Sequence, residues 1–138
     1  MPPCMVLAGH ETEGYAIEWN PHKECIMVGG SFDGKLTMWD LNSNKENKKV
    51  YPICHFNYHE KEIEDVSHHR FHDSLFASCD DGGKTALWDI RHPSFPLCHF
   101  STTANEQRCI QFSPLNRHLF ATAGSDCPIN FWDVRNMS

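Results

Sequence analysis

Three copies of one short pattern constrain the fold of this chain more than any other feature. Each copy is an apolar run that ends in Trp-Asp, and the copies read KLTMWDL, KTALWDI and PINFWDV. Their tryptophans, Trp39, Trp88 and Trp132, stand 49 and 44 residues apart. A period of this size indicates a repeat fold, in which each unit buries its apolar face against its neighbours rather than forming a core alone.

The difference between the two spacings locates an insertion. A second pattern, VYPICHF and SFPLCHF, repeats with Pro52 and Pro96 again 44 residues apart. The five extra residues therefore lie between Trp39 and Pro52, where NSNKENKK is polar and charged. We expect residues 42–49 to form a solvated loop.

Each unit contains short alternating runs separated by turn residues, such as YAIEW, ECIMVGG and KLTMW in the first unit. These runs predict strands, and the Asp-Gly before the third run is a hairpin signal. The runs PICHF and PLCHF add a fourth strand. Units of this kind are typical of β-propeller blades. We predict one all-β region, residues 1–138, with three four-stranded blades from repeats at about 5–50, 51–95 and 96–138, forming part of a propeller or assembled into a larger one.

Composition limits the function classes. With 138 residues, 40% of them hydrophobic, the chain has enough material for one domain. A net charge of −6 argues against sequence-independent binding to DNA or anionic lipid, which needs clustered Lys and Arg. Seven irregularly spaced cysteines, with no apolar leader or membrane-spanning run, indicate a reduced, soluble, intracellular protein.

The repeat pattern resembles the WD-repeat family over essentially the whole chain. Within that family, GHETEGYAIEWNP and IEDVSHHRFHDSLFASCDDGGKTALWDIR are similar to the histone-binding proteins of the retinoblastoma-binding, chromatin-assembly type. The final stretch, FSPLNRHLFATAGSDCPINFWDVRN, is similar to the next blade of the same proteins. An acidic WD family linked to ribosome assembly fits the first unit and matches the second less well.

The resemblance implies a non-enzymatic scaffold, without cofactor or metal, that binds a basic peptide such as a histone amino-terminal tail. It also implies other subunits of chromatin-assembly or chromatin-modifying complexes as partners, no sequence-specific nucleic acid and no membrane, and a nuclear location with a cytoplasmic pool as an alternative. No phosphate-binding loop or nucleophile elbow is visible. A structural or adaptor subunit that does not bind histones is the alternative function.

WD repeats often contain a hydrogen-bonded tetrad of His, Ser or Thr, Asp and Trp. The repeat spacing puts His10, His59 and Thr103 at the His position, Gly29, Ser78 and Thr122 at the hydroxyl position, and Asp33, Gly82 and Asp126 at the Asp position. Each repeat then lacks one member, so we expect partly satisfied networks with a structural rather than catalytic role. The predicted structural residues are His10, Asp33, Trp39, His59, Ser78, Trp88, Thr122, Asp126 and Trp132.

The same spacing aligns the residues around the start of each first strand, which rim the central channel in a propeller. The aligned sets are Tyr15, Glu64 and Arg108; Glu13, Glu62 and Glu106; and Phe32, Asp81 and Ser125. Five of these nine positions are acidic, two are aromatic and one is basic. The resemblance implies that the positions of Glu13, Tyr15, Glu64 and Asp81 contact the tail. The predicted peptide-binding rim is Glu13, Tyr15, Phe32, Glu62, Glu64, Asp81, Glu106 and Arg108.

Carboxylates at the rim can accept hydrogen bonds from a guanidinium or ammonium group, and a tyrosine ring offers a flat face to the cation. The alternative is a solvated acidic rim that favours solubility. Arg108 departs from the relatives, which usually have a neutral amide there. Its charge should either repel an incoming Lys or Arg or neutralise Glu64 or Glu106.

Two further patterns allow other interpretations. The motifs WDIR and WDVR place Arg91 and Arg135 where WD proteins that are substrate receptors of cullin ligases present an arginine to their adaptor. The alternative to this adaptor contact is that each arginine pairs with a local acid. The run His68-His69-Arg70-Phe71-His72 suggests a metal site, but no Cys or acid stands at a complementary spacing, so a turn between strands is favoured.

Three blades predict two exposed sheet faces and a last blade without an outer strand after Asp133. The leading run CMVLAG can supply such a strand, either within its own chain or in a second molecule. We therefore predict either a homodimer with six blades or a segment of a longer protein.

Overall fold

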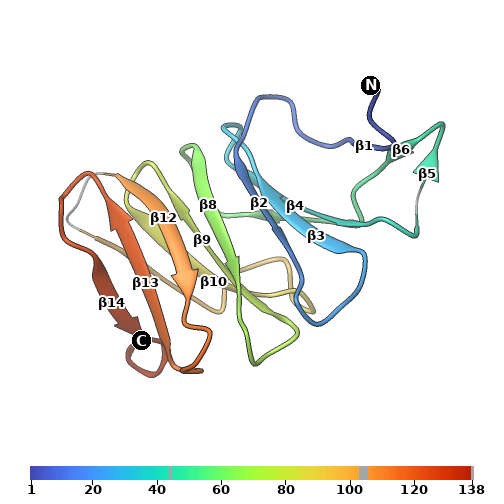
Figure 1. Ribbon diagram of the computed structural model, residues 1–138. Helices are drawn as coiled ribbons and strands as arrows, with labels where there is room; N and C mark the ends of the chain where they lie inside the picture. Colours follow the sequence, from blue (N-terminus) through green and yellow to red (C-terminus); the bar gives the residue numbers. More distant parts are fainter. Residues whose placement is uncertain (44, 103–105, 138) are drawn as a thin grey trace.

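A computed structural model describes residues 1–43, 45–102 and 106–137. It confirms the prediction of an all-β fold (Figure 1). The strands are β1 (Val6–Leu7), β2 (Ala16–Trp19), β3 (Ile26–Gly30), β4 (Lys35–Asp40), β5 (Lys45–Glu46), β6 (Lys49–Val50), β7 (Cys54–Asn57), β8 (Ile63–His68), β9 (Leu75–Asp80), β10 (Lys84–Asp89), β11 (Cys98–Ser101), β12 (Gln107–Phe112), β13 (Leu119–Gly124) and β14 (Asn130–Asp133). The short 3-10 helix η1 (Val134–Asn136) follows β14.

The main strands form three antiparallel sheets that fan out side by side (Figure 1). We call them blade 1 (β2-β3-β4-β7), blade 2 (β8-β9-β10-β11) and blade 3 (β12-β13-β14). The outer strand of blade 1 is β7, which comes from the second sequence repeat, and the outer strand of blade 2 is β11, which comes from the third, so the second and third repeats each contribute to two blades. Blade 3 has three strands among the described residues, as the lack of an outer-strand pattern after Asp133 predicts.

The insertion differs from the predicted loop. Its residues form a hairpin of β5 and β6, in which Asn47 and Lys48 have φ values of 47° and 66°. Two successive positive φ angles are those of a type I′ turn, which matches the twist of a hairpin and suits Asn. β1 pairs with β6 in parallel, so the leading strand lies within its own chain but beside the insertion rather than on blade 3.

The apolar core lies between the blades. Trp88 and Phe76 of blade 2 pack against blade 1, and Phe112 and Phe120 of blade 3 pack against blade 2. This face-to-face packing is the arrangement that the repeat predicts. All seven cysteines are free thiols, and no helix in the described part of the chain is long and apolar enough to cross a membrane.

Candidate functional site: the acidic rim

One backbone hydrogen bond recurs in all three blades and positions the rim. In each blade, the N–H of a residue in the turn after the second strand donates to the carbonyl oxygen of the glutamate that precedes the first strand. The pairs are Phe32 to Glu13 at 2.9 Å, Asp81 to Glu62 at 2.9 Å, and Ser125 to Glu106 at 3.2 Å. The structure therefore brings these six residues to the same end of their blades, in equivalent places.

Local sequence explains the conformation of the Glu13-Gly14-Tyr15 segment. A Cβ atom at Gly14 would lie 2.4 Å from the carbonyl oxygen of Gly30, so only glycine allows this close approach. The Ser31 hydroxyl also donates to the Glu13 carbonyl at 2.8 Å. These contacts tie the segment to blade 1 and leave the Glu13 side chain in solvent.

The blade 1 part of the rim is aromatic as well as acidic. Tyr15 and Phe32 pack edge to face, with their ring centroids 5.5 Å apart. Tyr15 is nevertheless 74% exposed. We call Glu13, Tyr15 and Phe32 the aromatic end of the rim, where a carboxylate lies beside an accessible π face.

The other part of the rim already contains a cation. Arg108 donates to Glu64 at 2.7 Å and to Glu106 at 2.9 Å, and its guanidinium lies 3.0 Å from an Asp81 oxygen in an ion pair. The hydrogen bonds that Arg108 donates to Glu106 and Glu64 raise the pKa of its guanidinium. We call these four residues the arginine-filled end. Of the two effects expected for Arg108, the structure shows neutralisation of neighbouring carboxylates.

The rim keeps an acidic excess despite Arg108. Five carboxylates, those of Glu13, Glu62, Glu64, Asp81 and Glu106, stand against one guanidinium. Chemically, the rim can accept hydrogen bonds from cationic side chains and can stack an aromatic or cationic group at Tyr15.

The tetrad of blade 2 is complete, so the prediction that it lacks its Asp is wrong. Asp80, two residues before Gly82, places its Oδ2 2.7 Å from Nδ1 of His59. Nε2 of His59 lies 2.7 Å from the Ser78 hydroxyl, which accepts from the Trp88 indole at 2.9 Å. Asp80 Oδ1 also accepts from the N–H groups of Gly82 and Lys84. One carboxylate at the end of β9 therefore serves both the histidine and the turn.

The tetrads of blades 1 and 3 are partial. In blade 1, His10 lies 3.4 Å from Asp33, and the Trp39 indole donates to the Ala8 carbonyl at 2.6 Å because Gly29 has no hydroxyl. In blade 3, Trp132 donates to Thr122 at 2.9 Å. Asp126 has a buried Oδ1 without a hydrogen bond among the described residues, and Thr103 lies outside them.

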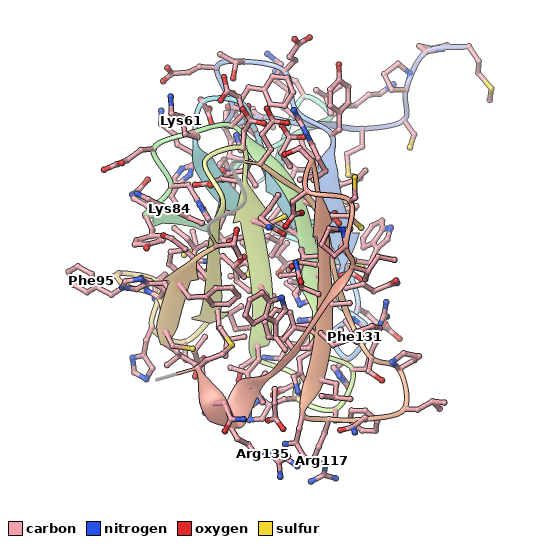
Figure 2. The ribbon with its side chains drawn as sticks, turned by 90° about the vertical axis from the view of Figure 1, so that its left-hand side faces the viewer. Lys61, Lys84, Phe95, Arg117, Phe131 and Arg135 are labelled. Atoms are coloured by element: carbon pink, nitrogen blue, oxygen red, sulfur yellow. The ribbon has the colours of Figure 1, made fainter. Side chains whose placement is uncertain are left out.

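The two WD-x-Arg motifs form local ion pairs. Arg91 binds the Asp89 carboxylate through Nε at 2.9 Å and Nη2 at 2.6 Å, and this hydrogen bonding lowers the pKa of Asp89 to about 2. Arg135 makes the same contacts with Asp133. Arg135 lies with Arg117 at the lower end in Figure 2, far from Lys61 near the upper end. Both arginines remain more than half exposed.

His68, His69 and His72 make separate contacts instead of forming one site. Burial lowers the pKa of His68 to about 4. Nε2 of His69 donates to the Arg117 carbonyl at 2.8 Å, and His72 lies 3.1 Å from the Ser74 hydroxyl. Within residues 1–43, 45–102 and 106–137, no three His, Cys, Asp or Glu side chains are placed to hold a metal ion.

Sequence reasoning missed the contacts that join the inner strands. Glu18 accepts a hydrogen bond from the backbone N–H of His68 and pairs with Arg70 at 3.0 Å. Asp65 accepts from the N–H of Ile110 at 2.9 Å. These polar side chains in apolar strands were the available signal, because a buried carboxylate needs a donor.

Comparison with known proteins agrees with the WD-repeat fold that the three blades indicate. The profile of the family described as "WD domain, G-beta repeat" matches residues 1–40. The chain contains the repeat that this profile describes, and its blades have the fold of part of a WD-repeat β-propeller.

Two relatives indicate which WD-repeat proteins the chain resembles. The chain is 36% identical over 93 residues to "Histone acetyltransferase type B subunit 2" of Mycosarcoma maydis, covering 67% of this chain and 22% of the relative. It is 34% identical over 89 residues to "WD-40 repeat-containing protein MSI3" of Arabidopsis thaliana, covering 64% and 21%. The chain thus resembles the histone-binding, chromatin-assembly WD proteins, and it spans about a fifth of the length of these relatives.

Proposed function

We propose that this chain is a non-enzymatic scaffold that binds a basic peptide, such as a histone amino-terminal tail, on its acidic rim. The observation that carries the proposal is the recurrence of Glu13, Glu62 and Glu106 in one backbone arrangement at one end of all three blades. Strand ends fold without acids, so a repeated carboxylate at this place favours a ligand of opposite charge.

The aromatic end is the first contact site in this proposal. Glu13 and Tyr15 are exposed, whereas the carboxylates of Glu64 and Glu106 already bond Arg108. A charge-assisted hydrogen bond contributes about 1.5 to 3 kcal/mol net, so two or three of them can anchor a tail at micromolar strength. Displacing or bypassing Arg108 would let the peptide extend along the rim.

The name of one relative, a subunit of a type B histone acetyltransferase, supports a place in complexes that act on histones. We propose a chromatin-assembly or chromatin-modifying complex and a nuclear location, with the cytoplasm as a second location. The alternative is an adaptor that uses the face of Arg91 and Arg135, and their bidentate pairing with Asp89 and Asp133 leaves each guanidinium partly occupied.

The test is binding of a fluorescent histone amino-terminal tail peptide at two salt concentrations. We expect micromolar binding that weakens with salt and falls at least tenfold in a Glu13→Ala, Glu64→Ala variant. A Glu24→Ala, Glu46→Ala variant is the matched control, because both residues are exposed and lie outside the rim and the charge change is the same. Equal losses in the two variants would reduce the rim to a non-specific acidic surface.

A further inference from the structure

Arg117 is an arginine without a carboxylate partner in the part of the chain that the structure describes. The other four arginines each pair with a carboxylate, and they are Arg70, Arg91, Arg108 and Arg135. The Arg117 guanidinium lies instead over the ring of Phe71, with its carbon 5.8 Å from the ring centroid. Arg117 is exposed, at the lower end of the molecule in Figure 2. This cation is held beside an aromatic ring and is able to bind an anion.

The loop that carries Arg117 has an equivalent in each of the other two blades. One backbone hydrogen bond of 2.9 Å closes the loop between the first and second strands in all three blades; the donor and acceptor residues are Asn20 and Ile26, His69 and Leu75, and Ser113 and Leu119. This alignment makes Glu24, Asp73 and Arg117 equivalent, and it makes His72 the equivalent of Lys23. Blades 1 and 2 therefore carry an acid where blade 3 carries Arg117.

The loops of neighbouring blades meet in the same way at both junctions. Between blades 1 and 2, the Asn20 side chain donates to the carbonyl oxygen of Asp73 at 3.1 Å. Between blades 2 and 3, Nε2 of His69 donates to the carbonyl oxygen of Arg117 at 2.8 Å. Because Asn20 is equivalent to His69 and Asp73 to Arg117, the side chains at the two junctions can be compared position by position.

Among the described residues, the ion pair of the first junction is not repeated at the second. Between blades 1 and 2, Nζ of Lys23 lies 3.3 Å from Oδ2 of Asp73. The equivalent residues between blades 2 and 3 are His72 and Arg117, and both are bases. Asp73 does not serve the second junction, because it pairs with Lys23 and its Oδ1 lies 3.9 Å from Nδ1 of His72, beyond hydrogen-bond distance. The second junction therefore has two basic groups where the first has a base and an acid.

A hollow lies at this second junction. Its volume is about 210 Å³, and it is lined by His69, Phe71, His72, Arg117, His118 and Val134. The Ser74 hydroxyl lies 3.1 Å from Nδ1 of His72. When that hydroxyl donates, Nε2 of His72 carries the ring proton and can donate it to a ligand, since this nitrogen has no hydrogen bond among the described residues. Arg117 and His72 thus offer two donors to one anion.

Both loops at the second junction also carry an exposed apolar side chain. Phe71 is 46% exposed, and Leu115, its equivalent in the loop of blade 3, is 90% exposed. Apolar side chains beside a cation suit a peptide that contains both acidic and apolar residues. A nucleic acid suits the site less well, because the net charge of −6 on the chain opposes a polyanion.

We propose that the hollow binds a carboxylate of an acidic peptide segment from a partner protein. The carboxylate accepts hydrogen bonds from Arg117 and His72, and it supplies the counter-ion that Asp73 supplies at the first junction. An apolar side chain of the same segment contacts Phe71 and Leu115. The site is separate from the acidic rim and does not depend on it, and its two donors differ from the WD-x-Arg arginines, which pair with their own aspartates.

The test is fluorescence anisotropy with a labelled peptide of four glutamates around one leucine. We expect saturable binding below about 1 mM that weakens about fivefold or more in Arg117→Gln, because the amide keeps a donor but loses the charge. Arg117→Asp restores the acid of the other two blades, so binding should be lost while the melting temperature is kept. Lys61→Gln is the matched control, because it removes the same charge from an exposed residue near the opposite end (Figure 2).

The place and the chemistry of the ligand are tested with the same chain. Shifts of the ¹⁵N-labelled amides should appear at Phe71 and Arg117, and the peptide with glutamine in place of glutamate should not bind. Equal weakening in Arg117→Gln and Lys61→Gln, amide shifts confined to the acidic rim, or no saturation with a folded chain overturns the proposal. Binding of a phosphoserine peptide without binding of the glutamate peptide also overturns it, because the ligand would then be a phosphate.

Discussion

Replacing Arg108 by glutamine should tighten the binding of a basic peptide. In the structure, Arg108 bonds Glu64 and Glu106 and pairs with Asp81, so three rim carboxylates share one internal cation. The Arg108→Gln variant removes that cation but keeps a polar side chain that still donates to a carboxylate. An incoming Lys or Arg then meets free acceptors instead of a like charge.

The expected gain follows from the geometry. A ligand cation bonded to Glu64 would lie roughly 5 Å from the Arg108 guanidinium, because both bond the same carboxylate, and the repulsion is about 0.8 kcal/mol at the dielectric constant of water and about 3 kcal/mol at an effective value of about 20. The Arg108 side chain is 49% exposed, which favours the lower figure. A gain of about 1 kcal/mol corresponds to roughly fivefold tighter binding.

Fluorescence anisotropy with a labelled histone tail peptide measures this change. Arg117→Gln is the matched control, because it removes the same charge from the opposite end of the molecule (Figure 2). Tighter binding in Arg108→Gln alone would show that the Arg108 cation opposes the peptide. Weaker binding in Arg108→Gln would contradict this role, since it would mean that the guanidinium itself holds the peptide or shapes the rim.

Two further predictions concern stability. His59→Ala removes the partner of the buried Asp80 Oδ2 and one hydrogen bond of Ser78, and it should lower the free energy of unfolding by about 3 to 5 kcal/mol. His10→Ala, which removes a contact of 3.4 Å to Asp33, should cost about 1 kcal/mol. Equal losses in urea denaturation would contradict the difference between the two tetrads. The pKa of His68 is about 4 in the folded chain, below its value of 6.5 in the unfolded chain. Between these two pH values the unfolded chain therefore binds more protons than the folded chain. The free energy of unfolding should fall by up to roughly 3 kcal/mol as the pH drops from 6.5 to 4. His68→Phe, which copies Phe112 of the next repeat, should flatten this part of the pH profile, and an unchanged profile would assign the acid sensitivity to other groups.

Much of the fold follows from the spacing of Trp39, Trp88 and Trp132, because a repeat fixes both the strand pattern and the residues that align between blades. The spacing also aligned the rim correctly, as the recurring hydrogen bonds of Phe32, Asp81 and Ser125 show. The repeat spacing did not predict that Asp80 is the tetrad acid of blade 2, because a carboxylate two residues from the aligned position can also reach the imidazole of His59. The hairpin in the insertion was missed because NSNKENKK has no alternating apolar pattern, and in the structure its second strand, β6, pairs with β1 as well as with β5.

The proposed site for a basic peptide is the acidic rim rather than the opposite, arginine-bearing end. The most direct measurement is a titration of an unlabelled histone amino-terminal tail peptide into the ¹⁵N-labelled chain, followed by the backbone amide resonances. We expect saturable shifts of the Tyr15, Phe32 and Asp81 amides at the rim, and unchanged Arg117 and Arg135 amides. Shifts confined to Arg117, Arg135 and their neighbours, or no shifts with a folded chain, would contradict it.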